Sequence, residues 1–180
     1  TAYALPWDGA SPVWVHAVSL GETRAAQTLI RQFIDRGERV LLTHMTATGR
    51  AEGARVFAAE IAAGQLRQQW IPYDFSGATQ KFMRHYHPRL GILIEREVWP
   101  NLIASAQVAE VPMVLASARF SEKSQKQVRQ IDQVFLTLMR ETYAGIDLTL
   151  AQTEDDATRL YEVGALNIHV VGNIKFDVAL

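Results

Sequence analysis

Short apolar runs alternate with longer amphipathic stretches along this chain. The first run, residues 12–18 (PVWVHAV), is apolar at nearly every position, and a polar loop follows it at 19–22. From residue 22 to residue 36, apolar side chains recur at three- and four-residue steps and so share one face of a helix. They are Ala26, Leu29, Ile30, Phe33 and Ile34, and Gly37 follows as a stop signal. This order predicts a buried strand followed by a helix that packs on it.

The same alternation continues to the end of the chain. It predicts seven strands, at residues 12–18, 39–44, 69–72, 89–94, 112–116, 147–151 and 167–171. It predicts six helices, at residues 22–36, 50–63, 75–86, 99–110, 121–143 and 154–163, with residues 46–49 as the loop before the second helix. Strands that alternate with helices form βαβ units around a mostly parallel sheet. The sequence therefore predicts an α/β fold, a Rossmann-like three-layer sandwich.

Composition narrows the class of protein. The 180 residues suit one domain, and 48% apolar with 21% charged residues is ordinary globular usage. Basic and acidic residues, 18 against 19, nearly cancel, which argues against a nucleic-acid partner held by charge. The absence of cysteine excludes disulfides and zinc-thiolate sites. No apolar run approaches the roughly 20 residues that span a bilayer, so these residues are expected to be soluble.

Ligands of parallel sheets gather beyond the carboxyl ends of the strands, where loops enter helices. The polar residues that follow each predicted strand are therefore the candidates for a site. They lie at 19–22, 46–49, 95–101, 117–121, 152–154 and 172–177.

Residues 19–22 allow two interpretations. Ser-x-x-Glu is the capping-box pattern, in which Ser19 caps a helix and Glu22 bonds back toward the preceding backbone. Spacing alone slightly favours this structural role. A carboxylate at a strand-to-helix junction also faces the ligand cleft, where it can act as a base. The two roles are compatible, because local hydrogen bonds that hold a carboxylate also position it for proton transfer.

Residues 95–101 (EREVWPN) bring two carboxylates, an indole and an amide to the end of an apolar strand. Glu97 is interpreted as structural, since a negative charge suits the N-terminus of the helix that follows. Trp99 is interpreted as a core residue. Glu95 is the member of this group that is expected to line the cleft.

Two later junctions carry cations. Arg119 lies within residues 117–121, beside two serines, and a guanidinium there suits a carboxylate or a phosphate. The alternative for Ser121 is that it caps the next helix. Lys175 lies in residues 172–177, after a glycine turn that either binds an anion or leads out of the domain.

Several common sites are absent from the sequence. His85 and His87 are two residues apart and so face different sides of a helix, which disfavours a metal site. The chain contains neither the glycine-rich dinucleotide fingerprint nor a phosphate-binding P-loop. It also lacks the Gly-x-Ser-x-Gly elbow of common hydrolases.

Five junction motifs occur in the order and spacing of one enzyme family. They are residues 14–22 (WVHAVSLGE), 43–49 (THMTATG), 95–101 (EREVWPN), 117–124 (SARFSEKS) and 172–177 (GNIKFD). Together they resemble the 3-deoxy-D-manno-octulosonic acid (Kdo) transferases, which build the inner core of lipopolysaccharide. The resemblance covers nearly the whole chain. Small departures are Ala47, where the family often has proline, and Phe120 and Lys123.

The resemblance implies a glycosyltransferase with two Rossmann-like domains that face each other across a cleft, the GT-B arrangement. Such an enzyme transfers Kdo from CMP-Kdo to a lipid A precursor, with inversion and without a metal or other cofactor. Residues 1–180 correspond to its N-terminal, acceptor-binding domain, and the C-terminal donor-binding domain and N-terminal membrane anchor are expected to lie outside them. This domain alone is not expected to catalyse transfer. The family works peripherally on the cytoplasmic face of the bacterial inner membrane.

The resemblance also implies roles for single residues. Glu22 matches the catalytic base of the family. Glu95 is expected to orient substrate, and Arg119 and Lys175 to contact the Kdo carboxylate or an acceptor phosphate. The other substrate-binding candidates lie in the matching motifs and are Ser19, Gly21, Thr48, Gly49 and Asn101.

Two other functions stay open. One is a non-catalytic module that binds a phosphorylated glycolipid, and the other is a different GT-B-like sugar-nucleotide enzyme, such as an epimerase. Basic residues of the second and third predicted helices are candidates for contacting acceptor phosphates or anionic headgroups, although a solvated helix face explains each of them alone. They are Arg50, Arg55, Lys81 and Arg84.

Overall fold

Parallel strands form a single sheet at the centre of the protein. The computed structural model describes residues 3, 11–129 and 133–174. Within this part of the chain the strands are β1 (Val13–His16), β2 (Val40–His44), β3 (Leu66–Trp70), β4 (Leu90–Ile94), β5 (Met113–Ala118), β6 (Leu148–Ala151) and β7 (Ile168–Val170). Their order is β3-β2-β1-β4-β5-β6-β7, and every neighbouring pair is parallel. The predicted α/β class is confirmed.

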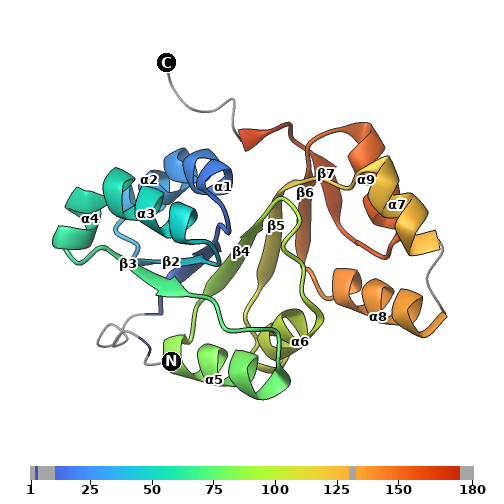
Figure 1. Ribbon diagram of the computed structural model, residues 1–180, viewed down its shortest axis with the longest axis horizontal. Coiled ribbons are helices and arrows are strands. Elements are labelled where there is room, and N and C mark those ends of the chain that lie inside the picture. The colour runs from blue at the N-terminus through green and yellow to red at the C-terminus, as the bar shows by residue number, and fades with distance from the viewer. Residues whose placement is uncertain (1–2, 4–10, 130–132, 175–180) are drawn as a thin grey trace.

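Helices cover both faces of this sheet (Figure 1). Among the described residues they are α1 (Leu20–Ala25), α2 (Gln27–Asp35), α3 (Ala47–Val56), α4 (Ala58–Ala62), α5 (Ser76–Tyr86), α6 (Pro100–Val108), α7 (Glu122–Arg129), α8 (Gln133–Ala144) and α9 (Glu154–Glu162). Val15 of β1 belongs to one hydrophobic cluster with Ile30 of α2, whereas Trp14 belongs to another with Phe82 of α5. Successive strand residues point to opposite faces, so β1 contributes to both cores of a three-layer sandwich.

The strand order reverses beside β1. The chain runs from β1 outward to β2 and β3 and then returns to β4 on the other side of β1. Because all the strands are parallel, their carboxyl ends meet at one edge of the sheet. The crevice at such a reversal is where ligands bind in open α/β sheets. The loops after β1 and β4 are therefore the first places to look for a site.

Several predicted segments have different boundaries in the structure. The helix expected at 50–63 is divided at Phe57 into α3 and α4. The helix expected at 22–36 begins at Leu20 and is divided at Ala26 into α1 and α2. Residues 47–49, expected in a loop, form the first turn of α3, because the Thr46 side chain caps that helix. The strand expected at 69–72 is β3, which starts earlier because buried Leu66 pairs with Val40 of β2.

The single long helix expected at 121–143 is wrong. α7 and α8 are separate helices that run in different directions (Figure 1), and residues 130–132 between them are outside the described part. The two helices have different neighbours. α8 packs beside α6, whereas Gln125 of α7 donates a hydrogen bond to Glu162 of α9. Tertiary contacts therefore override the continuous helical pattern.

Candidate functional site

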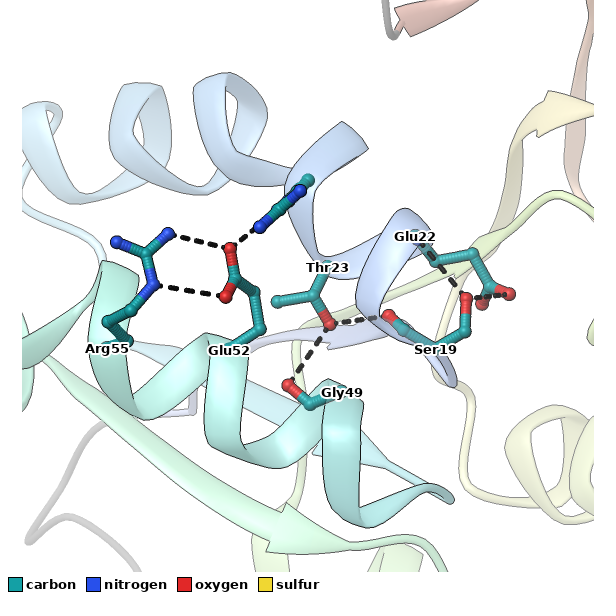
Figure 2. A network of polar contacts seen from close by, with 7 residues as sticks. Ser19, Glu22, Thr23, Gly49, Glu52 and Arg55 are labelled. Carbon is teal, nitrogen blue, oxygen red and sulfur yellow. Dashed lines mark hydrogen bonds and ion pairs between the residues drawn. The ribbon is translucent and has the colours of Figure 1, made fainter.

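The loop between β1 and α1 holds Glu22 in a defined position (Figure 2). The backbone N–H of Val18 donates to Glu22 Oε2 at 2.8 Å, and Ser19 Oγ donates to Glu22 Oε1 at 2.9 Å. Ser19 Oγ also accepts from the N–H of Glu22 at 3.3 Å, as the N-cap of α1. The predicted capping role is thus confirmed. Glu22 stays partly exposed, and its carboxylate oxygens have further lone pairs for a ligand.

The N-terminus of α3, which follows the neighbouring strand β2, supports this loop. Thr46 Oγ1 donates to the carbonyl of Val18 at 2.7 Å, and Thr23 Oγ1 of α1 donates to the carbonyl of Ser19 at 2.8 Å. Gly49 packs so closely that a Cβ there would be 2.7 Å from the Val18 carbonyl oxygen. The fold therefore requires glycine at position 49. A contact of Gly49 with substrate stays a prediction.

Gly21 and Thr48 are exposed at the same edge of the sheet. A Cβ on Gly21 would meet only Ser19 Oγ, at 4.0 Å, so packing does not require glycine there. Thr48 Oγ1 donates a long hydrogen bond of 3.4 Å to Thr46 Oγ1. Both positions are open to a ligand, and their predicted contacts with substrate stay predictions.

An ion-pair cluster that the sequence reasoning missed joins α1 to α3 beside the Glu22 loop (Figure 2). Glu52, whose side chain is 7% exposed, accepts from Arg24 Nε at 2.7 Å and from Arg55 Nη2 at 2.8 Å. The hydrogen bonds from Arg55 and then Arg24 lower the pKa of Glu52 to about 2. Arg55, a candidate for headgroup contact, is therefore bound to Glu52. The i, i+3 spacing of Glu52 and Arg55 was a signal that could have revealed the pair.

The loop after β4 has a strained backbone. Glu95 has a φ of 61°, and Ser117, near the end of neighbouring β5, has a φ of 53°. Left-handed backbone is uncommon outside glycine and gathers at functional sites. Hydrogen bonds maintain it here, since Glu95 N donates to Ala116 O at 3.0 Å and Arg119 N donates to Glu95 O at 3.2 Å. Glu95 thus lies at the sheet edge where a cleft is expected, and its contact with substrate stays a prediction.

Glu97 is electrostatically connected to Glu22, which the sequence reasoning did not foresee. Burial raises the pKa of Glu97, and the negative charge of Glu22 raises it further. Trp99 Nε1 donates to Glu97 Oε2 at 3.2 Å. The negative charge in the loop after β1 thus acts on a carboxylate in the loop after β4. Glu97 was interpreted as a helix N-terminal charge, but the first turn of α6 contains no acidic residue.

Asp74 caps α6 instead, from the loop before α5. Its carboxylate accepts from the backbone N–H of Asn101 at 3.1 Å and of Leu102 at 2.8 Å. Asn101 Nδ2 donates to the carbonyl of Asp74 at 2.8 Å. The Asn101 amide therefore ties the first turn of α6 to the loop before α5, and its contact with substrate stays a prediction. No local pattern pointed to Asp74, because Asn101 is 27 residues away along the chain.

Two aromatic rings link β1 to the loop after β4. The rings of His16 and Trp99 are in edge contact, with 5.4 Å between centroids. His16 is fully buried, its Nδ1 lies 2.9 Å from Thr43 Oγ1, and its Nε2 has no hydrogen-bond partner in the described part of the chain. Burial lowers the pKa of His16 to about 3, so the ring is neutral at pH 7. Trp99 packs against the core, as predicted.

The remaining motifs lie along the same edge. Arg119 is exposed and forms no ion pair with another described residue. Ser121 Oγ accepts from Ser124 N at 3.2 Å, which agrees with the alternative that Ser121 caps a helix. Asn173 Nδ2 donates to Gln152 Oε1 at 3.1 Å, so the last motif reaches the end of β6. Lys175 lies outside the described residues.

Two further features, a metal site and a membrane-spanning helix, are not found in residues 11–129 and 133–174. No group of three or more His, Asp or Glu side chains is arranged to hold a metal ion there. No helix in those residues combines the length and the apolar character that crossing a bilayer requires.

Comparison with known proteins identifies the family. Residues 2–178 match the family described as "3-Deoxy-D-manno-octulosonic-acid transferase (kdotransferase)". The chain belongs to the Kdo transferase family. The 3-deoxy-D-manno-octulosonic acid transferase of Bordetella pertussis is 57% identical over 171 residues, which are 95% of this chain and 39% of the relative. That of Rickettsia felis is 33% identical, over 92% of this chain and 34% of the relative.

Solved structures share the fold of this chain. The UDP-GlcNAc 2-epimerase of Neisseria meningitidis, bound to UDP-GlcNAc, matches it with a TM-score of 0.61 and 12% identity, over 92% of this chain and 48% of the epimerase. At such low identity the likeness shows the fold alone. The chain therefore has the architecture of one Rossmann-like half of a GT-B protein, as predicted.

Proposed function

We propose that this chain is the acceptor-binding domain of an inverting enzyme that moves Kdo from CMP-Kdo to a lipid A precursor, with Glu22 as the general base. The observation that carries the proposal is the Glu22 carboxylate, held by Val18 N and Ser19 Oγ at the carboxyl edge of the sheet and partly exposed. Family membership supports the reaction class. Because the chain spans 39% of the Bordetella relative, we assign CMP-Kdo binding to residues outside it.

A carboxylate held in this way suits proton transfer. As the acceptor hydroxyl oxygen forms its bond to the ketosidic carbon of Kdo, the hydroxyl proton passes to Glu22. The bond from that carbon to the CMP phosphate breaks on the opposite face, which inverts the carbon. Little reorientation is needed, because Val18 and Ser19 already hold both carboxylate oxygens.

The other motif residues surround this base in the proposed mechanism. Gly21 and Thr48 leave room for the acceptor, and Glu95 orients its hydroxyl groups. Arg119 and Lys175 bind the Kdo carboxylate or an acceptor phosphate. The remaining three residues, Ser19, Gly49 and Asn101, keep the loops in place. The reaction as proposed uses no metal or other cofactor and takes place at the cytoplasmic face of the inner membrane.

Replacing Glu22 with glutamine in the full-length transferase tests the base. Glutamine keeps the shape of the side chain and one acceptor oxygen but cannot take up the proton. We expect kcat to fall by roughly 10²–10⁴-fold, with little change in the unfolding midpoint. The matched control is Glu60→Gln, which removes a carboxylate paired with Arg31 on α2, and it should retain activity. Near-normal turnover of Glu22→Gln would contradict the assignment.

A further inference from the structure

An open aromatic pocket lies at the same edge of the sheet as Glu22, on the side of β3. It encloses about 520 Å³, within the roughly 300–1,000 Å³ of small-molecule sites. Its walls include Met45 after β2, Trp70 at the end of β3, and Tyr73 and Phe75 in the loop that leads to α5. Because β1, β2 and β3 are parallel neighbours, the pocket and the Glu22 loop follow the carboxyl ends of adjacent strands.

Four large apolar side chains in this pocket are left uncovered by the fold. Tyr73 is 72% exposed, Phe75 71%, Met45 44% and Trp70 36%. None of them belongs to either hydrophobic core cluster. Single exposed apolar residues are ordinary, but several gathered around one cavity mark a binding site. The pocket therefore suits an apolar ligand.

The rim of the pocket is cationic. The Arg50 guanidinium lies over the Trp70 ring, 5.0 Å from its centroid, and Lys81 of α5 lines the pocket. Neither cation forms an ion pair with another residue that the structure describes. Asp74, in the same loop as the aromatic residues, does not neutralise them, because its carboxylate binds the N-terminus of α6. Apolar walls with a positive rim match an acyl chain joined to a phosphorylated headgroup.

The pocket is connected to the Glu22 loop through two consecutive residues. Met45 lines the pocket, and Thr46 donates to the carbonyl of Val18, directly before Ser19. We propose that the pocket binds an acyl chain of the acceptor lipid while Arg50 and Lys81 contact its phosphate. The inference rests on the function proposed above and adds to it the subsite that holds the lipid. A chain seated in the pocket leaves the headgroup on the side of Glu22.

Direct binding tests the pocket independently of transfer. The probe is dodecyl phosphate, with and without bromine on the terminal carbon, added to the full-length protein. Because Trp70 is in the wall whereas Trp14 is buried, the brominated probe should quench tryptophan fluorescence, and Trp70→Phe should remove most of the quenching. Replacing both Tyr73 and Phe75 with serine should weaken binding about tenfold, which corresponds to about 1.4 kcal/mol. The matched control is Tyr161→Ser on α9, which is 70% exposed and should bind normally.

Acceptor kinetics supply the second readout. In the Tyr73→Ser/Phe75→Ser variant, KM should rise about tenfold for the acylated acceptor in detergent and stay unchanged for the deacylated acceptor. An unchanged KM for the acylated acceptor, or an equal rise for both acceptors, would overturn the pocket proposal while the transferase function stands. The pocket proposal would also be overturned if this variant lost only its binding to anionic vesicles, since the pocket residues would then contact the membrane. If the brominated probe quenched Trp70 but the wild-type protein catalysed no transfer, the proposed function would be overturned and the pocket proposal would stand.

Discussion

Two acidic loops at the carboxyl edge of the sheet are built in different ways. The first junction is the loop after β1, which contains Glu22, and the second is the loop after β4, which contains Glu97. The bonds that hold Glu22 join residues three or four positions apart. The loop after β4 depends on distant residues, since Asp74 caps the helix that follows it and His16 packs on its tryptophan. The first arrangement can form from one turn of chain, whereas the second exists only once the sheet is assembled.

This difference has a chemical consequence. The Glu22 carboxylate is partly exposed and receives two hydrogen bonds, which suits an ionised group. Glu97 is also partly buried, and burial together with the charge of Glu22 raises its pKa. A raised pKa favours the protonated form of a carboxyl group, which is less suited to accept a proton. Of the two carboxylates, Glu22 is therefore the one that we propose as the base.

The largest change in stability should come from acid, which protonates two buried histidines. Burial lowers the pKa of His16 to about 3 and that of His44 to about 4, from an ordinary value of 6.5. The unfolded chain therefore binds protons that the folded chain does not, and stability falls as the pH drops below 6.5. We expect a loss of about 2 kcal/mol per histidine between pH 7 and pH 5 in the free energy of unfolding, measured by urea denaturation.

Single variants separate the contributions to this acid effect. His16→Asn should remove about half of the pH dependence, because His44 contributes the other half. The range from pH 7 to pH 5 avoids the titration of Glu52, whose folded pKa is lowered to about 2 and whose contribution is lost only below about pH 4.5. An unaltered slope in His16→Asn would mean that His16 does not stay neutral in the folded protein.

The next largest effect should come from the tertiary cap. Asp74→Ala removes the acceptor of two backbone N–H groups at the start of α6, at Asn101 and Leu102. We expect the free energy of unfolding to fall by about 2 kcal/mol, because the bonds are charge-assisted and the helix end loses its cap. Asp74→Asn keeps one acceptor oxygen and should lose less. Equal stability of Asp74→Ala and the wild type would show that water replaces the cap.

The local cap of the first junction should matter less for stability and more for activity. Ser19→Ala removes the hydroxyl that accepts from Glu22 N and donates to Glu22 Oε1. We expect a loss of about 1 kcal/mol in stability, and a lower kcat because Glu22 is held by Val18 alone. Ser19→Thr keeps the hydroxyl and should restore both quantities. A normal kcat for Ser19→Ala would make the serine a purely structural cap.

The same contrast explains what the sequence could predict. The hydrophobic periodicity predicted the parallel sheet, and the Ser-x-x-Glu spacing predicted the cap that Ser19 and Glu22 form after β1, because these signals lie within a few neighbouring residues. The Asp74 cap and the effect of the Glu22 charge on Glu97 could not be predicted, because they depend on residues that the fold brings together from separate parts of the chain. The long helix expected at 121–143 failed for a related reason, since contacts with α6 and α9 decide the course of α7 and α8. Local patterns therefore predict the first junction better than the second.

The smallest expected change in stability is a gain rather than a loss, and it comes from Gly21→Ala. Gly21 has no steric need to be glycine, since a Cβ there would meet only Ser19 Oγ at 4.0 Å. Gly21→Ala should therefore stabilise the protein by about 0.5–1 kcal/mol, because alanine loses less conformational freedom in a helix. The added methyl group would lie beside the hydroxyl that holds Glu22, where the acceptor is proposed to bind. We expect a higher KM for the acceptor together with a higher unfolding midpoint, a combination that damage to the fold does not produce, and an unchanged KM would place the acceptor elsewhere.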